Sequence, residues 1–220
     1  MKKSALSLLV IGVIALCSCG FQPSVKGDSL INKAREKYKN LDSAKVVMTN
    51  MDTNEVEQTF VFKYDEKGLL SFAYEGKNGD DVYAQYNNGV ENFSYEKGKY
   101  EYSQKGDEKF VAYTKDVPHP QADEGLIVFQ PSAVKKATVK KEDGVTHVRH
   151  EYDVDELGVA KNTKAFTADY YFDNKDNLLY FVESSTIVND GKKQEYVYKV
   201  EITDKNKVDK VENTVEKYKD

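Results

Sequence analysis

Apolar and polar side chains alternate with a period of two between residues 44 and 104. Where Phe60, Phe62 and Tyr64 follow one another at alternate positions, the rings share one face and polar side chains share the other. A period of two is typical of a β-strand with one buried face. Turns with glycine, such as the one at Gly89, separate these stretches and supply the positive φ of tight hairpins. This half of the chain predicts a meander of about six antiparallel strands.

The same alternation resumes between residues 134 and 203 and predicts about five further strands. The intervening stretch, residues 105–132, lacks the pattern and contains Pro118, Pro120 and Pro131. Long irregular insertions in a compact sheet domain are usually functional or mobile. We therefore keep two interpretations of this stretch, a lid over the sheet and a crossover packed against the end of the sheet.

A helical period precedes the first strand. Apolar side chains recur there at helical spacing while charged side chains fill the other positions. The apolar positions are Leu30, Ile31, Ala34, Tyr38 and Leu41. The pattern predicts an amphipathic helix of about 13 residues, capped by Asp28, that buries one face. A weaker helical pattern in residues 206–220 predicts a short helix or a frayed end.

These elements predict a mostly β fold. We expect a strongly curved antiparallel sheet or unclosed barrel of about 11 strands, with an N-terminal amphipathic helix and an irregular mid-chain segment. No linker-like stretch interrupts the pattern, so we expect residues 28–220 to form a single β-rich extracytoplasmic domain. That length is sufficient for one sizeable core.

The start of the chain has a different composition. Lys2 and Lys3 precede an uncharged run from Ala5 to Leu16, and small residues then lead to Cys19. This order of charge, apolar run and small residues is that of a secretory signal peptide. The apolar run has about a dozen residues, fewer than the roughly 20 of a membrane-spanning helix. We expect residues 1–18 to be removed and residues 19–27 to form a short tether.

The residues from Leu16 to Cys19 also resemble the bacterial lipobox, in which a leucine stands three positions before an acylated cysteine. The resemblance implies that Cys19 carries a diacylglyceryl thioether, becomes the mature N-terminus and anchors the protein through palmitate-like chains. The protein would then lie on the extracytoplasmic face of the cell membrane, or at the outer membrane in a cell with two. The alternative is an ordinary signal peptide cleaved nearby, which leaves a free thiol; Cys17 fits the motif less well as the acylated residue.

Composition narrows the possible partners. The net charge is −5 and acidic and basic residues are interspersed, which argues against nucleic acid as a partner. The chain has 16 Tyr and 10 Phe but no Trp, a composition that suits strands. Both cysteines precede the predicted domain, so that domain has no disulfide.

The sequence shows no arrangement of histidines or catalytic motifs that is typical of an enzyme or a metal site. His147 and His150 are three positions apart in a predicted strand, so their rings point to opposite faces. His119 lies between two prolines with no identifiable nucleophile. The chain also lacks the Gly-x-Ser-x-Gly and His-Glu-x-x-His motifs. We therefore expect no enzymatic activity, no metal and no cofactor.

The order of elements resembles the LolA-type architecture. A lipobox, an amphipathic helix, six strands, an irregular break and about five further strands follow one another, and the resemblance covers residues 28–203. This group includes periplasmic lipoprotein carriers and the LppX-type lipoproteins of mycobacteria. The resemblance implies an unclosed β-barrel with helices over its open face, and a concave face that binds acyl chains.

A curved sheet cannot bury its apolar concave face by itself. The helix covers part of it, and a loosely packed mid-chain segment would leave a cavity for a lipid or acyl chain. We expect nine rings along this face: Phe60, Phe62, Tyr64, Phe72, Tyr74, Tyr170, Phe172, Tyr196 and Tyr198. If the helix fills the face completely, these rings are core instead.

The alternative function is a surface interaction lipoprotein that contacts another envelope protein or a cell-wall polymer without a small ligand. The two functions differ in where apolar surface stays accessible. A continuous apolar cavity of several hundred Å³ favours lipid binding. A packed centre with exposed aromatic side chains on the outer face favours the interaction protein.

Overall fold

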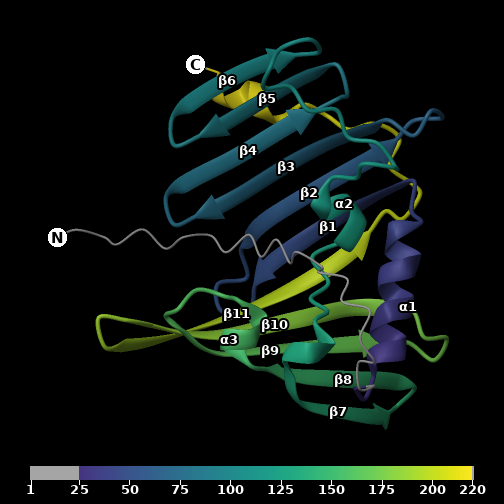
Figure 1. Cartoon of the computed structure of the whole chain (residues 1–220), viewed down its shortest axis with the longest axis vertical. Coiled ribbons are helices and arrows are strands. Elements are labelled where there is room, and N and C mark those ends of the chain that lie inside the picture. The colour runs from purple at the N-terminus through teal and green to yellow at the C-terminus, as the bar shows by residue number, and fades with distance from the viewer. Residues whose placement is uncertain (1–24, 220) are drawn as a thin grey trace.

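A computed structural model describes residues 25–219 and arranges eleven strands in one sheet (Figure 1). The first six strands are β1 (Ser43–Asn50), β2 (Val56–Tyr64), β3 (Leu70–Asn78), β4 (Asp81–Asn87), β5 (Glu91–Glu96) and β6 (Lys99–Gln104). The other five are β7 (Val134–Glu142), β8 (Val145–Tyr152), β9 (Thr163–Phe172), β10 (Leu178–Asn189) and β11 (Lys192–Thr203).

The order of strands across the sheet is β6-β5-β4-β3-β2-β1-β11-β10-β9-β8-β7, and all neighbours are antiparallel. Each half is a meander of sequential hairpins, and the pairing of β1 with β11 joins the two halves. β6 and β7 stand at opposite edges and do not pair with each other. The predicted mostly β fold with an unclosed antiparallel sheet is therefore confirmed.

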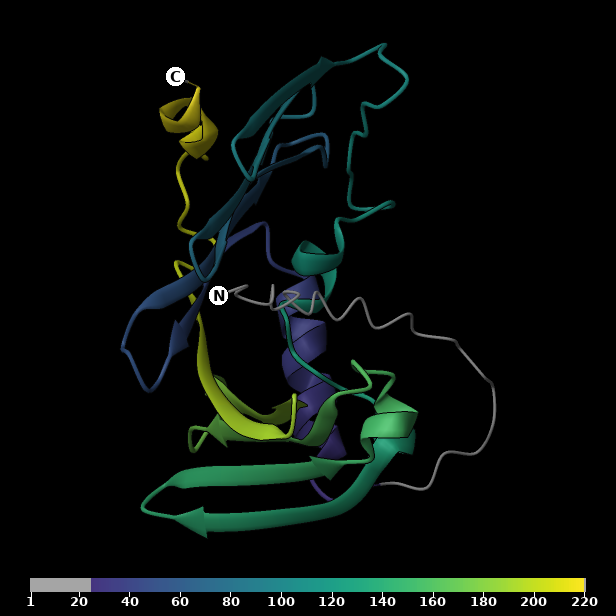
Figure 2. The ribbon, with the colours of Figure 1, turned by 90° about the vertical axis from the view of Figure 1, so that its left-hand side faces the viewer.

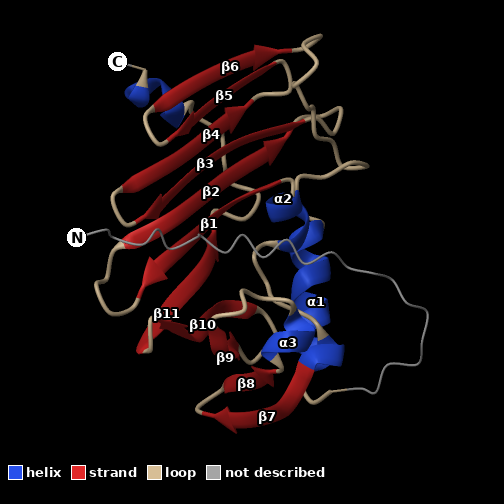
Figure 3. Ribbon diagram, turned by 60° about the vertical axis from the view of Figure 1, so that its left-hand side comes forward, coloured by secondary structure: helices blue, strands red, loops and turns tan. Residues whose placement is uncertain are grey.

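The N-terminal helix is α1 (Asp28–Lys39), and it runs across the strands from the middle of the sheet toward β7 (Figure 3). Its N-cap is Gly27 and not Asp28, so the predicted cap is wrong by one residue. Gly27 has a φ of 88°, and a Cβ atom there would collide with the side chain of Val148. The Asp28 carboxylate instead accepts a hydrogen bond from the Val25 N–H at 2.8 Å.

The mid-chain segment, residues 105–133, packs against the same side of the sheet as α1. It contains α2 (Pro120–Glu124) and a 3₁₀ turn (Pro131–Ala133). Ala122, Ile127 and Val128 are buried in the main core. The structure shows this segment packed onto the face of the sheet, which is the position expected for a lid rather than for a crossover at the end of the sheet. A third short helix, α3 (Val154–Leu157), follows β8.

One core lies between the sheet and these helices. We call the sheet face that packs on α1 the inner face and the opposite face the outer face. α1 contributes Ile31, Ala34 and Tyr38 to this core. The mid-chain segment and strands from both halves of the sheet supply the rest, so the core connects the two meanders.

The C-terminal segment crosses the outer face. In Figure 2 the C-terminal turn (yellow) lies on one side of the sheet, and α1 and α2 lie on the other. This turn is a 3₁₀ helix (Thr214–Tyr218), a short helix as the sequence predicts. Val211 and Val215 are buried, and the ring of Tyr218 stacks on Tyr95 with 4.6 Å between centroids.

The predicted signal peptide, residues 1–18, and Cys19 lie outside the described residues, as do residues 20–24 of the predicted tether. These stay predictions from the sequence. No helix within residues 25–219 combines the length and the apolar character that crossing a membrane requires.

Candidate functional site

The candidate site is the inner face of the sheet, because it carries the nine aromatic side chains predicted to bind a ligand. Strand register places these side chains on one face: Phe60 pairs with Val46 and Tyr74, and Tyr170 pairs with Phe181. The face therefore continues from β3 through the central strands to β9.

Six of the nine rings lie in the packed core. Five of them have no exposed surface and the sixth, Tyr64, is 7% exposed. The five are Phe60, Phe62, Phe72, Tyr170 and Phe172. The helix meets this cluster directly, since Tyr38 packs edge-on against Phe62 at 5.8 Å between centroids. These rings form the surface on which α1 and the mid-chain segment pack.

His119 inserts into the same cluster from the mid-chain segment. Its ring centroid lies 5.3 Å from that of Phe60, 4.5 Å from that of Phe72 and 4.9 Å from that of Tyr113. Burial lowers the pKa of His119 to about 4, so the ring is neutral near neutral pH. Its Nδ1 atom accepts a hydrogen bond from the Gln121 N–H at 3.3 Å. His119 thus holds α2 in place, a role that its position between two prolines did not reveal.

Polar contacts from α1 also hold the mid-chain segment on the inner face. Arg35 donates to the Ile127 carbonyl at 2.9 Å and lies 3.4 Å from the Glu124 carboxylate. The Tyr38 hydroxyl donates to the Gln121 carbonyl at 2.7 Å. Buried and partly buried hydrogen bonds of this kind fix a segment in one position. The part of the inner face beneath α2 is therefore closed.

The inner face extends beyond this closed part. Some of its side chains remain partly exposed, and we call this region the inner-face margin. It comprises Met48, Tyr74, Glu183, Tyr196 and Tyr198. The rings of Tyr196 and Tyr198 stand nearly parallel, at 11° and 6.3 Å between centroids. The margin thus contains the three predicted ring residues that the core does not bury.

Glu183 is the unusual residue of the margin. It lies directly opposite Tyr198 on one side and Ala168, which is fully buried, on the other. Burial of its carboxyl group raises the pKa of Glu183 from 4.5 to about 8. No hydrogen bond or ion pair within residues 25–219 involves this carboxyl group. The surrounding sequence alternates only weakly, so nothing in it distinguishes Glu183 from a solvent-facing glutamate.

Gln58 is a second polar group on the inner face. It pairs with Met48 on one side and Gly76 on the other, and it is 8% exposed. Its Nε2 atom is buried and has no hydrogen-bond partner among the described residues. The Tyr74 hydroxyl lies over Gly76, at the place that a Cβ atom would occupy. A buried donor without a partner costs free energy, and such groups in native proteins call for an explanation.

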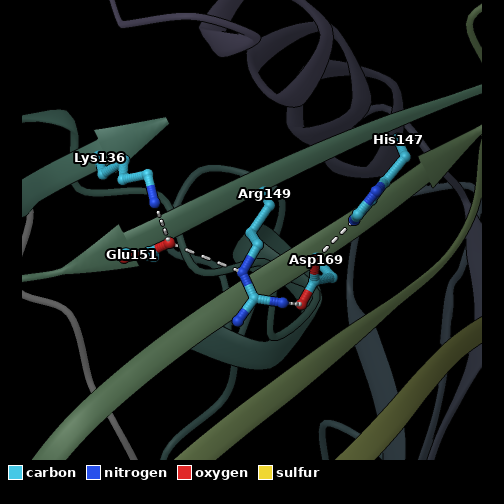
Figure 4. Close-up of polar contacts among 5 residues, drawn as sticks. All are labelled: Lys136, His147, Arg149, Glu151 and Asp169. Atoms are coloured by element: carbon cyan, nitrogen blue, oxygen red, sulfur yellow. Dashed lines mark hydrogen bonds and ion pairs between the residues drawn. The ribbon is translucent and has the colours of Figure 1, made fainter. Parts of the chain in front are cut away.

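The outer face of β8 and β9 carries an ionic network (Figure 4). Asp169 accepts from both His147, at 2.6 Å, and Arg149, at 3.2 Å. Glu151 lies 4.0 Å from Arg149 and 3.2 Å from Lys136. Because both oxygens of Asp169 contact basic side chains, the network ties β8 to β9.

The predicted opposition of the two strand histidines is confirmed. His147 lies on the outer face, where its ring stacks on Tyr171 at 4.7 Å. His150 is buried on the inner face and its Nε2 atom lies 2.9 Å from the Lys26 carbonyl. Within the described residues, no three His, Cys, Asp or Glu side chains gather as metal ligands would.

A small hollow of about 170 Å³ lies on the outer face beside the C-terminal segment. Its lining includes Thr59, Val61, Ala73, Glu75 and Thr214. The volume is below the several hundred Å³ typical of small-molecule sites. The lining also includes Gln58, Gly76 and one predicted ligand residue, Tyr74, but none of the other eight predicted ring residues.

Comparison with known proteins adds little to this geometry. No family model and no curated protein matches the chain. Among solved structures, LprF from Mycobacterium bovis is 14% identical, with a TM-score of 0.46, over 87% of this chain and 98% of LprF. MucB, in a complex with MucA, is 8% identical with a TM-score of 0.18, over 80% of this chain and 93% of MucB. Neither likeness is close enough to carry a ligand or partner over to this chain.

Proposed function

We propose that this protein is a lipid-anchored, extracytoplasmic lipoprotein that binds an amphipathic ligand at the inner-face margin and catalyses no reaction. The observation that carries the ligand-binding part is the continuity between the buried apolar core and the partly exposed margin. Met48, Tyr196 and Tyr198 extend the same face that Phe60 and Tyr170 close beneath the helices. The anchoring part rests on the lipobox-like residues before Cys19.

The margin suits an apolar chain with a polar end better than a wholly apolar molecule. Thioether and ring surfaces adapt to a flexible chain, and each buried CH₂ contributes about 0.8 kcal/mol. The margin also contains polar groups, the tyrosine hydroxyls and the Glu183 carboxyl, which a pure hydrocarbon would leave without partners. A lipid or an acylated molecule satisfies both conditions.

Two measurements test this function. Cells that express the full chain are labelled with a palmitate analogue, and we expect label on the wild-type protein but not on Cys19→Ala. The mature chain from residue 19, with Cys19→Ser, is then analysed by native mass spectrometry after mild purification. We expect a bound mass that a Tyr198→Ala variant loses. Label that persists on Cys19→Ala would refute the anchor, and repeated spectra of ligand-free protein would refute the binding.

A second function, interaction with an envelope protein or cell-wall polymer, is favoured by two observations. Six of the nine predicted ring residues are packed core, and an aromatic cluster lies on the outer face of β4–β6. Phe93 lies 5.0 Å from Tyr102, 6.1 Å from Tyr86 and 6.3 Å from Tyr100 between ring centroids. Tyr102 is 48% exposed. In the same mass-spectrometric experiment, ligand-free spectra together with co-purification of a partner that Tyr102→Ser abolishes would support this second function.

A further inference from the structure

The chemistry of the margin points to the polar end of the ligand. Glu183 carries the acidic group of the inner-face margin, and the groups around it are aromatic or apolar. Tyr198 stands directly opposite on β11, and directly opposite residues on one sheet face have Cβ atoms about 5 Å apart. Ala168 stands opposite on β9. A carboxyl group in these surroundings is partly desolvated without a compensating cation.

The other charged and titratable groups near Glu183 are engaged in contacts of their own. His150 on β8, in the same row across the sheet, lies 2.9 Å from the Lys26 carbonyl. Tyr170 on β9 donates its hydroxyl hydrogen bond to the Val128 carbonyl, and Tyr152 on β8 lies 3.3 Å from the Tyr170 hydroxyl. Arg35 on α1 influences both tyrosines, but its guanidinium contacts Glu124 and the mid-chain backbone. The structure thus supplies a carboxyl group, nearby hydroxyls and rings, and no free cation among the described neighbours.

The electrostatic environment of Tyr198 is acidic as well. Burial, and next the negative charge of Glu57, raise the pKa of Tyr198 to about 12; Asp52 adds to the same effect. Glu57 lies near the start of β2 and Asp52 in the turn that follows β1. Glu57 and Asp52 therefore place negative charge near Tyr198, and Glu183 lies opposite Tyr198 in the strand register, so this region of the inner face attracts positive charge.

We propose that Glu183, with the rings of Tyr196 and Tyr198, binds a cationic amine or quaternary ammonium group at the polar end of the ligand. This inference rests on the proposed function, since it assigns the chemical class of the ligand that the margin binds. Aromatic faces attract ammonium groups, and a carboxylate completes the recognition of the charge. The apolar chain then lies along Met48 toward Tyr74.

The unpartnered amide of Gln58 is independent evidence for a ligand on this face. Its Nε2 atom is buried and Met48 separates it from β11, so it lies along the path of the apolar chain. A carbonyl or ester oxygen of the ligand would accept the hydrogen bond that this nitrogen lacks within the protein. The position of Gln58 fits an oxygen-bearing linkage between the apolar chain and the cationic group of the ligand.

The test compares three amphiphiles that share one alkyl chain. Decyltrimethylammonium, decyl maltoside and decanoate are titrated below their micellar concentrations into the mature chain, residues 19–220, with Cys19→Ser. The fold lies within the described residues 25–219, so this chain retains the sheet and both faces. Because the chain has no Trp, calorimetry or tyrosine fluorescence reports binding.

At pH 8.5 we expect the cationic amphiphile to bind about tenfold more tightly than the neutral one. Glu183→Gln should reduce this preference to about twofold or less while binding of decyl maltoside persists. Glu201→Gln is the matched control, because Glu201 lies on the outer face of β11 and pairs with Lys199 at 2.8 Å. This control should retain the full preference.

A second measurement keeps the inference testable if Glu183→Gln alters the fold. In the unsubstituted chain, affinity for the cation should rise by up to about tenfold per pH unit between roughly pH 6 and 8, because the bound cation requires ionised Glu183. Affinity for decyl maltoside should not change over that range. Equal affinity for all three amphiphiles at every pH would overturn the inference but leave the proposed function standing. A lack of binding by any amphiphile would overturn both.

Discussion

At the scale of single residues, Glu183 shows how a side chain that looks ordinary in the sequence becomes distinctive once its strand is placed. Apolar residues precede it and polar residues follow it along the chain, and β10 alternates only weakly between buried and exposed positions. The register with β9 and β11 turns Glu183 onto the core side. Burial among these neighbours therefore raises the pKa of its carboxyl group from 4.5 to about 8.

This raised pKa predicts a loss of stability with rising pH. Between about pH 4.5 and 8 the unfolded chain releases the Glu183 proton and the folded chain keeps it, so the free energy of unfolding falls as pH rises. Glu183→Gln removes this contribution. From pH 5 to pH 8.5, we expect the free energy of unfolding of Glu183→Gln to increase by about 1 kcal/mol or more relative to that of wild type. Thermal unfolding should show this as a relative increase of roughly 2–4 °C in Tm. A constant difference between the two proteins across this pH range would contradict the assignment, and Glu201→Gln serves as control.

At the scale of elements, the mid-chain segment is held on the sheet by a few specific contacts rather than by regular structure. α2 has five residues, and its position depends on His119 between the Phe60 and Phe72 rings and on hydrogen bonds from α1. Segments with few anchoring contacts open locally at lower free energy than the sheet that supports them. We therefore expect the mid-chain segment to open locally without unfolding of the strands.

Arg35→Leu tests this expectation. The substitution removes the hydrogen bond to Ile127 and the ion pair with Glu124, a loss of about 1.5–3 kcal/mol for a charged group. We expect hydrogen–deuterium exchange to accelerate in residues 118–130 while β1 and β11 keep their protection. Lys33→Leu is the matched control, since Lys33 is half-exposed and pairs only with Asp176 on the surface. If the strands and α2 exchanged equally faster, the segment would not be an independent cover.

At the scale of the whole molecule, packing on both faces stabilises one open sheet. α1 and the mid-chain segment cover the inner face, and the C-terminal segment crosses the outer face near β4 and β5. There Lys217 contacts Glu75 at 2.6 Å and Val215 has no exposed surface. The edge strands β6 and β7 each pair with one neighbour and have no strand on their other side. Stability therefore depends on contacts between residues that lie far apart in the chain.

Val215→Ala tests the contribution of the C-terminal segment. Removal of two buried methyl groups leaves a cavity between this segment and the sheet, and we expect the free energy of unfolding to fall by about 1–3 kcal/mol. Val117→Ala makes the same chemical change at a side chain that is 63% exposed and should stay within about 0.5 kcal/mol of wild type. Equal denaturant midpoints for the two variants would show that the segment adds nothing to the stability of the fold.

The strands and the first helix could be predicted because their signals are local. Alternation at Phe60, Phe62 and Tyr64, and glycines with positive φ such as Gly89, act within a few residues, and the structure has eleven strands at these places. The period of α1 likewise identified Ile31, Ala34 and Tyr38 as its buried positions. The separation of His147 from His150 followed from strand geometry alone.

Only the tertiary structure decided which aromatic side chains are core and which remain accessible. The same alternation places Phe60 and Tyr198 on one face, but Phe60 lies under α2 and Tyr198 lies beyond it. That difference depends on where residues 105–133 return to the sheet, and no local pattern encodes a contact across so long a separation. The environment of Glu183 has the same origin, since desolvation is a property of the assembled neighbours and not of the residue.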